Sequence, residues 1–164
     1  MRSTTSEFEN VPLRLCVRRP APGGPGGVGP GTRMTVVVPS DLDIVEHTVD
    51  LVARHCLACG LSIKSVRFNL RVALSEALAN AIVYGNRLDP AKRVYVAIRE
   101  VDQQVHVHVE DQGDGFDPDC IPDPRHPDCL DRPAGRGLFL IKQLVDELAF
   151  NDQGNSICMT LRRG

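Results

Sequence analysis

Aromatic residues are scarce in this chain of 164 residues, at 4%, and tryptophan is absent. A core must therefore be built from valine, leucine, isoleucine and alanine, and a hydrophobic fraction of 42% suffices for one domain of ordinary size. An excess of one charge is also missing, because 19 basic and 21 acidic residues give a formal net charge of −2. Such a chain has no general attraction to nucleic acid or to a membrane, so an anionic ligand must be captured locally.

No apolar run reaches the length of a membrane span, and the first residues, MRSTTSEFEN, lack the apolar core of a signal peptide. We therefore expect a cytoplasmic protein whose six cysteines are reduced. Cys56 and Cys59 form a C-x-x-C pair within a helical pattern, and no second pair completes a zinc site, so we interpret them as structural. Cys120, His126 and Cys129 share a loop but have no evident fourth metal ligand, which disfavours a metal site there.

Proline and glycine make up ten of the twelve residues in PAPGGPGGVGPG, which spans 20–31. This composition is typical of a flexible linker, so we expect a disordered tail over 1–33 and a folded domain over 34–164. Met34 directly precedes the first predicted strand, which raises the hypothesis that translation starts there. The intact mass of the native protein would test this, and a mass that includes the first 33 residues would refute it.

Hydrophobic periodicity and turn residues predict the elements of the domain. The predicted strands are 34–38, 93–101, 105–111, 149–151 and 156–161, and the predicted helices are about 41–60, 62–84 and 135–148. This order of elements predicts an α+β two-layer sandwich with a mixed, mostly antiparallel sheet and about three helices packed on one face.

The first candidate motif contains Glu76 and Asn80, whose spacing of four places both side chains on one helix face, one turn apart. Their neighbours are small or apolar, and polar groups on such a helix are costly unless they meet a polar partner. An asparagine carbonyl suits magnesium, which prefers hard oxygen ligands, and a glutamate can accept the proton of an attacking hydroxyl. The alternative is an ordinary polar pair without a function, because the motif alone is weak.

The second candidate motif begins with Asp111, at the end of a predicted strand, and reads DQGDGF. Gly113 and Gly115 let the backbone approach a ligand without interference from a Cβ atom. The Asp111 carboxylate can accept a hydrogen bond from an exocyclic amino group, which would select adenine over guanine. The alternative is a tight acidic turn, whereas a calcium loop is disfavoured because its later glutamate is missing.

The third candidate motif is Gly135, Arg136 and Gly137 at the start of a predicted helix. Free N–H groups at a helix N-terminus favour phosphate, although the alternative is a plain helix start after a flexible loop. The Lys-Ser/Thr pair of a P-loop does not follow. The charge of a phosphate would therefore be met by a metal ion, by the backbone, and by Arg132 or Arg136.

In this order, the three motifs together resemble the GHKL ATPase superfamily, which includes gyrase B, Hsp90, histidine kinases and MutL. The segments SEALANAIVYGN, DQGDGFDP and GRGLFLIKQLVDEL are similar to anti-sigma-factor serine/threonine kinases of the RsbW/SpoIIAB type. This resemblance extends over about four-fifths of the chain, almost from Met34 to Gly164. It implies the histidine-kinase-like ATPase fold, with ATP and Mg²⁺ as ligands.

The resemblance also implies a role for each motif residue. Glu76 would be the catalytic base, Asn80 the magnesium ligand and Asp111 the adenine-binding carboxylate. Gly113 and Gly115 would flank the adenine.

At the phosphate end, the resemblance implies Gly135 and Gly137, with Arg136 between them, and an ATP lid over 117–134 that contains no lysine. It further implies a homodimer that binds a sigma factor and phosphorylates a serine or threonine of an STAS-domain antagonist. The alternative is a nucleotide-gated binding module that holds its partner without transferring phosphate. A histidine-kinase ATPase lobe is disfavoured, because no pair of phosphoacceptor helices precedes the motifs.

Overall fold

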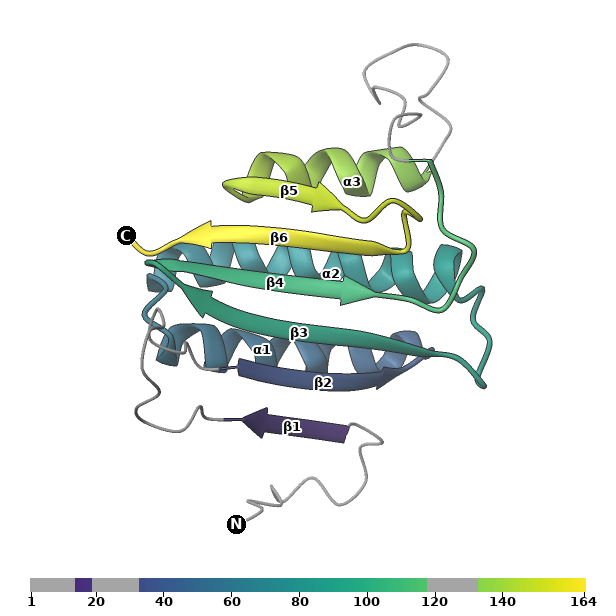
Figure 1. Ribbon diagram of the computed structural model, residues 1–164, viewed down its shortest axis with the longest axis horizontal. Coiled ribbons are helices and arrows are strands. Elements are labelled where there is room, and N and C mark those ends of the chain that lie inside the picture. The colour runs from purple at the N-terminus through teal and green to yellow at the C-terminus, as the bar shows by residue number, and fades with distance from the viewer. Residues whose placement is uncertain (1–13, 19–32, 118–132) are drawn as a thin grey trace, which may run out of the picture.

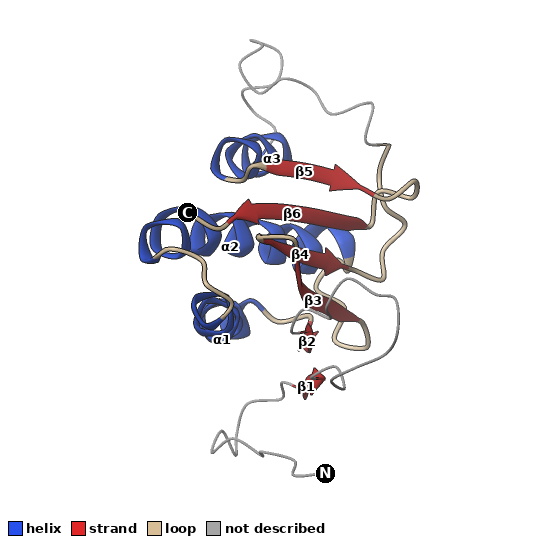
Figure 2. Ribbon diagram, turned by 60° about the vertical axis from the view of Figure 1, so that its left-hand side comes forward, coloured by secondary structure: helices blue, strands red, loops and turns tan. Residues whose placement is uncertain are grey.

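The computed structural model describes residues 14–18, 33–117 and 133–164. In these ranges, six strands form one sheet in the order β1-β2-β3-β4-β6-β5. The helices lie on one side of this sheet, and the other side carries none of the described helices (Figures 1 and 2). The predicted α+β two-layer sandwich is confirmed, but the described strand pairs are all antiparallel, so the sheet is not mixed.

The elements have well-defined bounds. The strands are β1 (Arg14–Arg18), β2 (Arg33–Pro39), β3 (Arg93–Val101), β4 (Gln104–Glu110), β5 (Glu147–Phe150) and β6 (Ser156–Arg162). The helices are α1 (Val45–Ala58), α2 (Arg71–Asn80) and α3 (Pro133–Leu144). Shorter helical turns are η1 (Leu42–Ile44), η2 (Ser65–Leu70) and η3 (Ala81–Gly85). Within the described ranges, no helix is both long enough and apolar enough to cross a bilayer.

The long helix predicted over 62–84 is present as one helical path through η2, α2 and η3. Its two ends have the wide turns of a π-helix rather than regular α geometry. The wide turn at η3 ends at Gly85, next to the turn that carries Asp111. The helix therefore delivers Glu76, Asn80 and Gly85 along one path toward the same end of the sheet.

Alternation of apolar residues along the strands explains the packing of the sheet on the helices. One face of β2, β3, β4 and β6 is buried and is made of Met34, Val36, Val38, Val94, Val96, Ile98, Val105, Val107, Val109, Ile157, Met159 and Leu161. Leu70, Leu74 and Leu78 cover it from the helical layer. Cys56 and Cys59 are also buried in this core as free thiols, and burial raises the pKa of Cys56 to about 12, which agrees with a structural role.

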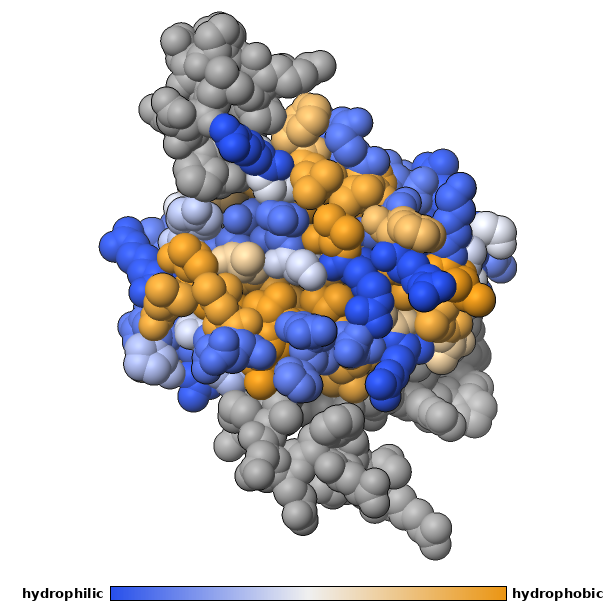
Figure 3. Space-filling model, turned by 180° about the vertical axis from the view of Figure 1, so that it is seen from behind, coloured by the Kyte–Doolittle hydropathy of each residue, from blue (hydrophilic) through white to orange (hydrophobic). Residues whose placement is uncertain are grey.

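Apolar side chains are also present on the outer surface of the helical layer. Figure 3 shows this side, where apolar areas lie between hydrophilic ones. Among the residues whose exposure is described, the most exposed large hydrophobic ones are Ile63 and Phe68, at 67% and 64%, near the start of the long helical path. The helical layer therefore has apolar surface outside the core.

The bounds of the elements also differ from the sequence-based expectation at both ends of the domain. Strand β1 lies within the predicted tail over 1–33 and pairs with β2, whose first residue, Arg33, also belongs to that tail. The other residues of the tail are outside the described ranges, and the domain division remains a prediction. The helix predicted over 135–148 ends at Leu144, because Glu147–Phe150 is strand β5. Leu148 pairs with Met159 of β6, so pairing in the sheet overrides the local helical preference.

Candidate functional site

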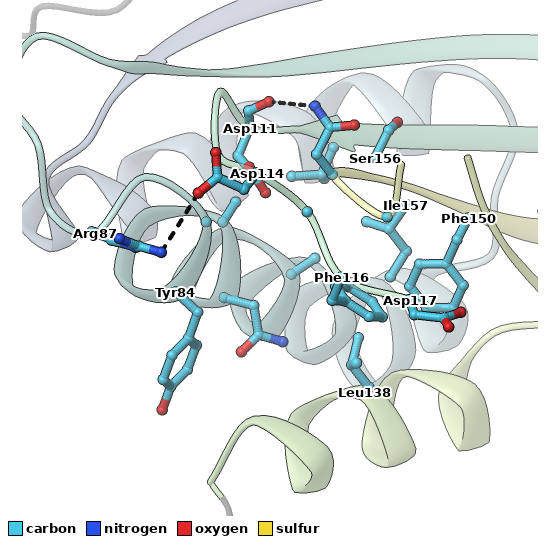
Figure 4. Close-up of a pocket in the computed structure, with 18 of the residues that line it drawn as sticks. Tyr84, Arg87, Asp111, Asp114, Phe116, Asp117, Leu138, Phe150, Ser156 and Ile157 are labelled. Atoms are coloured by element: carbon cyan, nitrogen blue, oxygen red, sulfur yellow. Dashed lines mark hydrogen bonds and ion pairs between the residues drawn. The ribbon is translucent and has the colours of Figure 1, made fainter. Parts of the chain in front are cut away.

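A cavity of about 400 Å³ lies between the long helix, α3 and the ends of β4 and β6 (Figure 4). This volume is typical of sites for small organic ligands. Its wall is largely apolar and includes Ala77, Ala81, Val109, Phe116, Leu138 and Ile157. Polar side chains enter it at separate places, chiefly Asn80 from the helix and Asp111 from the turn after β4.

Asn80 lines the cavity, and Glu76 lies one helical turn before it without being part of the lining. Both side chains are half-buried, and neither forms a hydrogen bond with another described residue. Gly137 of α3 lies against both, because a Cβ atom at this position would come within 2.8 Å of Glu76 Oε2 and 3.2 Å of Asn80 Nδ2. The first and third sequence motifs therefore meet, and they meet closely because residue 137 has no side chain.

Asp111 is joined to the β5–β6 hairpin by two hydrogen bonds. Its backbone N–H donates to the carbonyl oxygen of Asn155 at 2.9 Å, and Asn155 Nδ2 donates to the carbonyl oxygen of Asp111 at 3.0 Å. Its Oδ1 accepts a hydrogen bond from the backbone N–H of Gly113 at 2.8 Å. Its Oδ2 has no donor among the described residues, so this oxygen is available to a ligand. Partial burial raises the pKa of Asp111 above its ordinary value.

The glycines of the Asp111 turn have different surroundings. Gly113 is buried against the carbonyl oxygen of Gly85 and is not part of the cavity wall. Gly115 does line the cavity, with φ +76, and a Cβ atom there would overlap the carbonyl oxygen of Gln153. Only glycine suits such a conformation at so close an approach.

The start of α3 supplies the remaining predicted residues. Gly135 lines the cavity, whereas Arg136 is exposed and is not among the lining residues. The loop predicted as a lid lies outside the described residues between 118 and 132, as do Cys120, His126, Cys129 and Arg132. Asp117, at the start of this loop, lines the cavity.

Several residues of the cavity were given no role in the sequence analysis, although Phe116 and Asp114 lie within the second motif. Phe116 and Phe150 pack edge to face, with ring centroids 5.4 Å apart, and form part of the apolar wall. Gly154 has φ +73 and lies against the carbonyl oxygen of Phe116. At the rim, Arg87 forms an exposed ion pair with Asp114 at 3.6 Å. A glycine within the final hairpin turn was a visible signal, but only the pairing of β4 with β6 brings that turn beside Asp111.

The chemistry of the cavity suits a flat heteroaromatic base. An apolar slot with one carboxylate oxygen available at its end matches a heteroaromatic ring that carries an amino group. Among the described residues, no group of three or more His, Cys, Asp or Glu side chains could hold a metal ion. Asn80, which lines the cavity, carries a side-chain oxygen of the hard kind that magnesium prefers.

Comparison with known proteins points to the same chemistry. The family model for the histidine kinase-like ATPase domain matches residues 38–161, which include all three motifs. The serine-protein kinase RsbW of Oceanobacillus iheyensis is 30% identical over 100 residues, which cover 57% of this chain and 63% of that protein. The anti-sigma F factor of a Geobacillus species is 29% identical over 90 residues, which cover 52% of this chain and 60% of that protein.

A third relative is the serine/threonine-protein kinase BtrW of Bordetella bronchiseptica, 26% identical over 99 residues, which cover 58% of this chain and 70% of that protein. The chain spans about three-fifths of the length of the RsbW and anti-sigma F relatives. The family match, by contrast, extends over most of the chain, from the end of β2 to the end of β6. The chain therefore belongs to the family of histidine kinase-like ATPase domains.

Proposed function

We propose that the protein is an ATP-dependent serine/threonine kinase that acts as an anti-sigma factor and phosphorylates an STAS-domain antagonist. The observation that carries this proposal is the contact of Gly137 with Glu76 and Asn80, beside a cavity that Asp111 also lines. The names of the relatives support the two activities, since two are protein kinases and one is an anti-sigma factor. A cytoplasmic homodimer that binds a sigma factor belongs to the same proposal.

The base of ATP would occupy the apolar slot. Asp111 Oδ2 would accept a hydrogen bond from the exocyclic amino group of adenine, while Oδ1 is already held by Gly113. Guanine would place a carbonyl oxygen near this carboxylate, and two acceptors that face each other repel. The Asp111 carboxylate thus supports selection of adenine.

The triphosphate would extend toward Asn80 and the N-terminus of α3, which presents free N–H groups. Bound Mg²⁺ would bridge phosphate oxygens and offset their negative charge, with Asn80 Oδ1 as its protein ligand. Glu76 would accept the proton of the serine or threonine hydroxyl. At the same time the hydroxyl oxygen would bond to the γ-phosphorus, and the bond between that phosphorus and the oxygen of ADP would break. The role of Glu76 requires a free carboxylate, and no described residue binds its side chain.

A transfer assay with γ-labelled ATP, Mg²⁺ and STAS-domain proteins from the same organism tests the proposal. We expect the wild-type protein to label the STAS protein, and Glu76→Gln to bind ATP normally but transfer phosphate about 10²–10⁴ times more slowly. Glu147→Gln is the matched control, because Glu147 is an exposed carboxylate on β5 that pairs with Arg162.

Three outcomes contradict the proposal in distinguishable ways. Normal transfer by Glu76→Gln would remove this residue from the mechanism. ATP-dependent binding of partners without any transfer by the wild-type protein would instead establish a nucleotide-gated binding module. Absence of ATP binding would refute both functions.

A further inference from the structure

Asn86 directly follows the long helical path and is fully buried. Its Nδ2 donates to Ser40 Oγ at 2.7 Å and to the carbonyl oxygen of Arg93 at 3.0 Å. Its Oδ1 accepts from the backbone N–H of Gln112 at 2.8 Å. These partners follow β2, begin β3 and follow β4, so one buried carboxamide ties three strand ends to the end of the helix.

The backbone beyond Asn86 is strained. Arg87 and Leu88 have φ values of 56 and 57, in the left-handed region that residues other than glycine rarely adopt. Backbone hydrogen bonds from Asn86 to Ala81 at 2.7 Å and from Leu88 to Ile82 at 2.8 Å close the helix end over this bend. Strain of this kind persists where the surroundings over-determine the conformation, and the side-chain bonds of Asn86 contribute to that constraint.

Asn86 is connected to both sides of the contact between the helix end and the turn that carries Asp111. Gly85 precedes Asn86 and packs directly against the Asp111 carboxylate. Gln112, whose N–H is held by Asn86, lies between Asp111 and Gly113, and Gly113 packs against the Gly85 carbonyl oxygen. A shift of Asn86 would therefore move the helix end and the turn relative to each other, and with them the carboxylate.

Gln112 and Ser40 reinforce this arrangement. Gln112 Oε1 accepts from the backbone N–H of Arg93 at 2.7 Å, so the turn is bonded to the start of β3 a second time. Ser40 Oγ in turn donates to the carbonyl oxygen of Lys92 at 3.0 Å. Ser40 is not among the residues that line the cavity, yet it supports Asn86 directly.

We infer that Asn86 is a positioning residue for recognition of the base: its hydrogen bonds to Ser40, Arg93 and Gln112 hold the Asp111 carboxylate where it receives the amino group of adenine. This inference rests on the proposed function and adds to it the residue that sets selectivity between 6-aminopurines such as adenine and 6-oxopurines such as hypoxanthine and guanine. Asn86 itself does not line the cavity and acts through Asp111.

The test compares the dissociation constants of ATP and inosine triphosphate, which carries an oxygen in place of the amino group. We expect the wild-type protein to bind ATP more tightly. Asn86→Leu, which keeps the size of the side chain and removes its hydrogen bonds, should reduce this preference at least about tenfold, and Ser40→Ala about threefold. The loss should fall on ATP, with little change for inosine triphosphate.

Thr48→Val is the matched control for Ser40→Ala. Thr48 is fully buried, and its Oγ1 donates to the carbonyl oxygen of Ile44 at 2.9 Å, so this variant also removes a buried hydroxyl. It should leave the preference for ATP unchanged. In an Asp111→Ala background, Ser40→Ala should cause no further loss of preference, because the carboxylate that it positions is gone.

An unchanged preference in both Asn86→Leu and Ser40→Ala would overturn the inference, as would an equal loss of affinity for the two nucleotides. Thermal unfolding of each variant identifies any that does not fold, and if Asn86→Leu fails to fold, Ser40→Ala and its double mutant decide the question. A wild-type protein that binds no ATP would refute the proposed function, whereas normal ATP binding with unchanged preference in the variants refutes only the positioning role.

Discussion

The two ends of the cavity differ in how their polar groups are held. At the base end, Asp111 is bonded to Gly113 and Asn155, and the turn around it is bonded to Asn86. At the phosphate end, neither the Glu76 nor the Asn80 side chain forms a hydrogen bond within the described ranges. Half-buried polar groups without partners are costly. In the proposed function, the base end is organised by the protein itself, whereas the phosphate end would acquire its partners from the ligand.

The largest effect on stability should come from Gly115→Ala, which disrupts the packing of the Asp111 turn against the β5–β6 hairpin at the base end. Gly115 has φ +76 and lies against the carbonyl oxygen of Gln153, so a side chain would strain the backbone and displace the hairpin. The free energy of unfolding should fall by about 3 kcal/mol, and ATP binding should be lost. Urea denaturation and calorimetric titration measure the two effects.

Gly60→Ala is the control for that variant. Gly60 also has a positive φ, +90, but a Cβ atom there would meet only the flexible side chain of Arg163, at 3.3 Å. The cost should be about 1 kcal/mol with normal ATP affinity. If the two variants lost equal free energy of unfolding, the contact of Gly115 with the hairpin would contribute nothing beyond the strain of its positive φ.

At the phosphate end, Asn80→Ala should change function without changing stability. Because the Asn80 side chain has no described partner, its removal should leave the urea midpoint nearly unchanged. Affinity for ATP should fall about tenfold in the presence of Mg²⁺, equivalent to about 1.4 kcal/mol, and should not change in EDTA. Asn69→Ala, at another half-buried asparagine of the same helical path, is the control and should bind ATP normally. The magnesium role is wrong if titrations of Asn80→Ala match the wild type under both conditions.

A smaller effect is expected from Asp111→Asn, which should separate the contribution of Asp111 to stability from its contribution to ATP binding. Burial raises the pKa of Asp111 in the folded state, so the folded state binds this proton more tightly than the unfolded chain does. Stability due to this group is thus greatest below the ordinary pKa of aspartate and is lost as the pH rises through the raised pKa. Asp111→Asn should therefore melt at a higher temperature than the wild type near neutral pH, although it binds ATP poorly.

The difference in melting temperature should shrink as the pH falls below the ordinary pKa of aspartate, because Asp111 is then neutral in both states. Melting curves across this range measure it. A difference that does not depend on pH would show that the substitution acts through packing rather than through the charge.

The smallest effect is expected at the rim, where Arg87 and Asp114 are exposed to 78% and 94%. Arg87→Ala should lower the free energy of unfolding by less than about 0.5 kcal/mol, and the loss should vanish in 1 M salt. Denaturation at low and high salt measures it. A larger loss that persists in high salt would mean that Arg87 has a structural role in the bend after the helix.

Elements with a strong local pattern could be predicted from the sequence. The alternating valines of β3 and β4 predicted these strands within a residue of their observed bounds. The apolar stripe around Leu74 and Leu78 likewise predicted the whole helical path through η2, α2 and η3, although not its π-helical ends. Strand β5 was predicted over 149–151 but begins two residues earlier, because Glu147 and Leu148 favour a helix locally and only pairing with β6 makes them a strand. The predicted division of the chain at residue 33 remains a prediction.

The residue types of the site were also recognisable, but their contacts were not. Glu76, Asn80 and Asp111 were identified as candidates from their order and spacing, and their assigned roles remain predictions. The approach of Gly137 to Glu76, the packing of Gly85 on Asp111 and the bond between Asn86 and Ser40 join residues far apart in the chain. Nothing in the local sequence of either partner indicates these pairs.

The sequence by itself determined the periodicity of the strands and helices and the chemical kinds of side chain at the cavity, because both depend on neighbours within a few residues. The tertiary structure decided which glycine meets which carboxylate, and which oxygen of Asp111 remains available. Those contacts depend on the register of β4 against β6 and on the approach of α3 to α2. The strand register and the distance between these helices are set when the whole sheet is buried under its helices. Every element contributes to that burial, so no local segment of the sequence determines it.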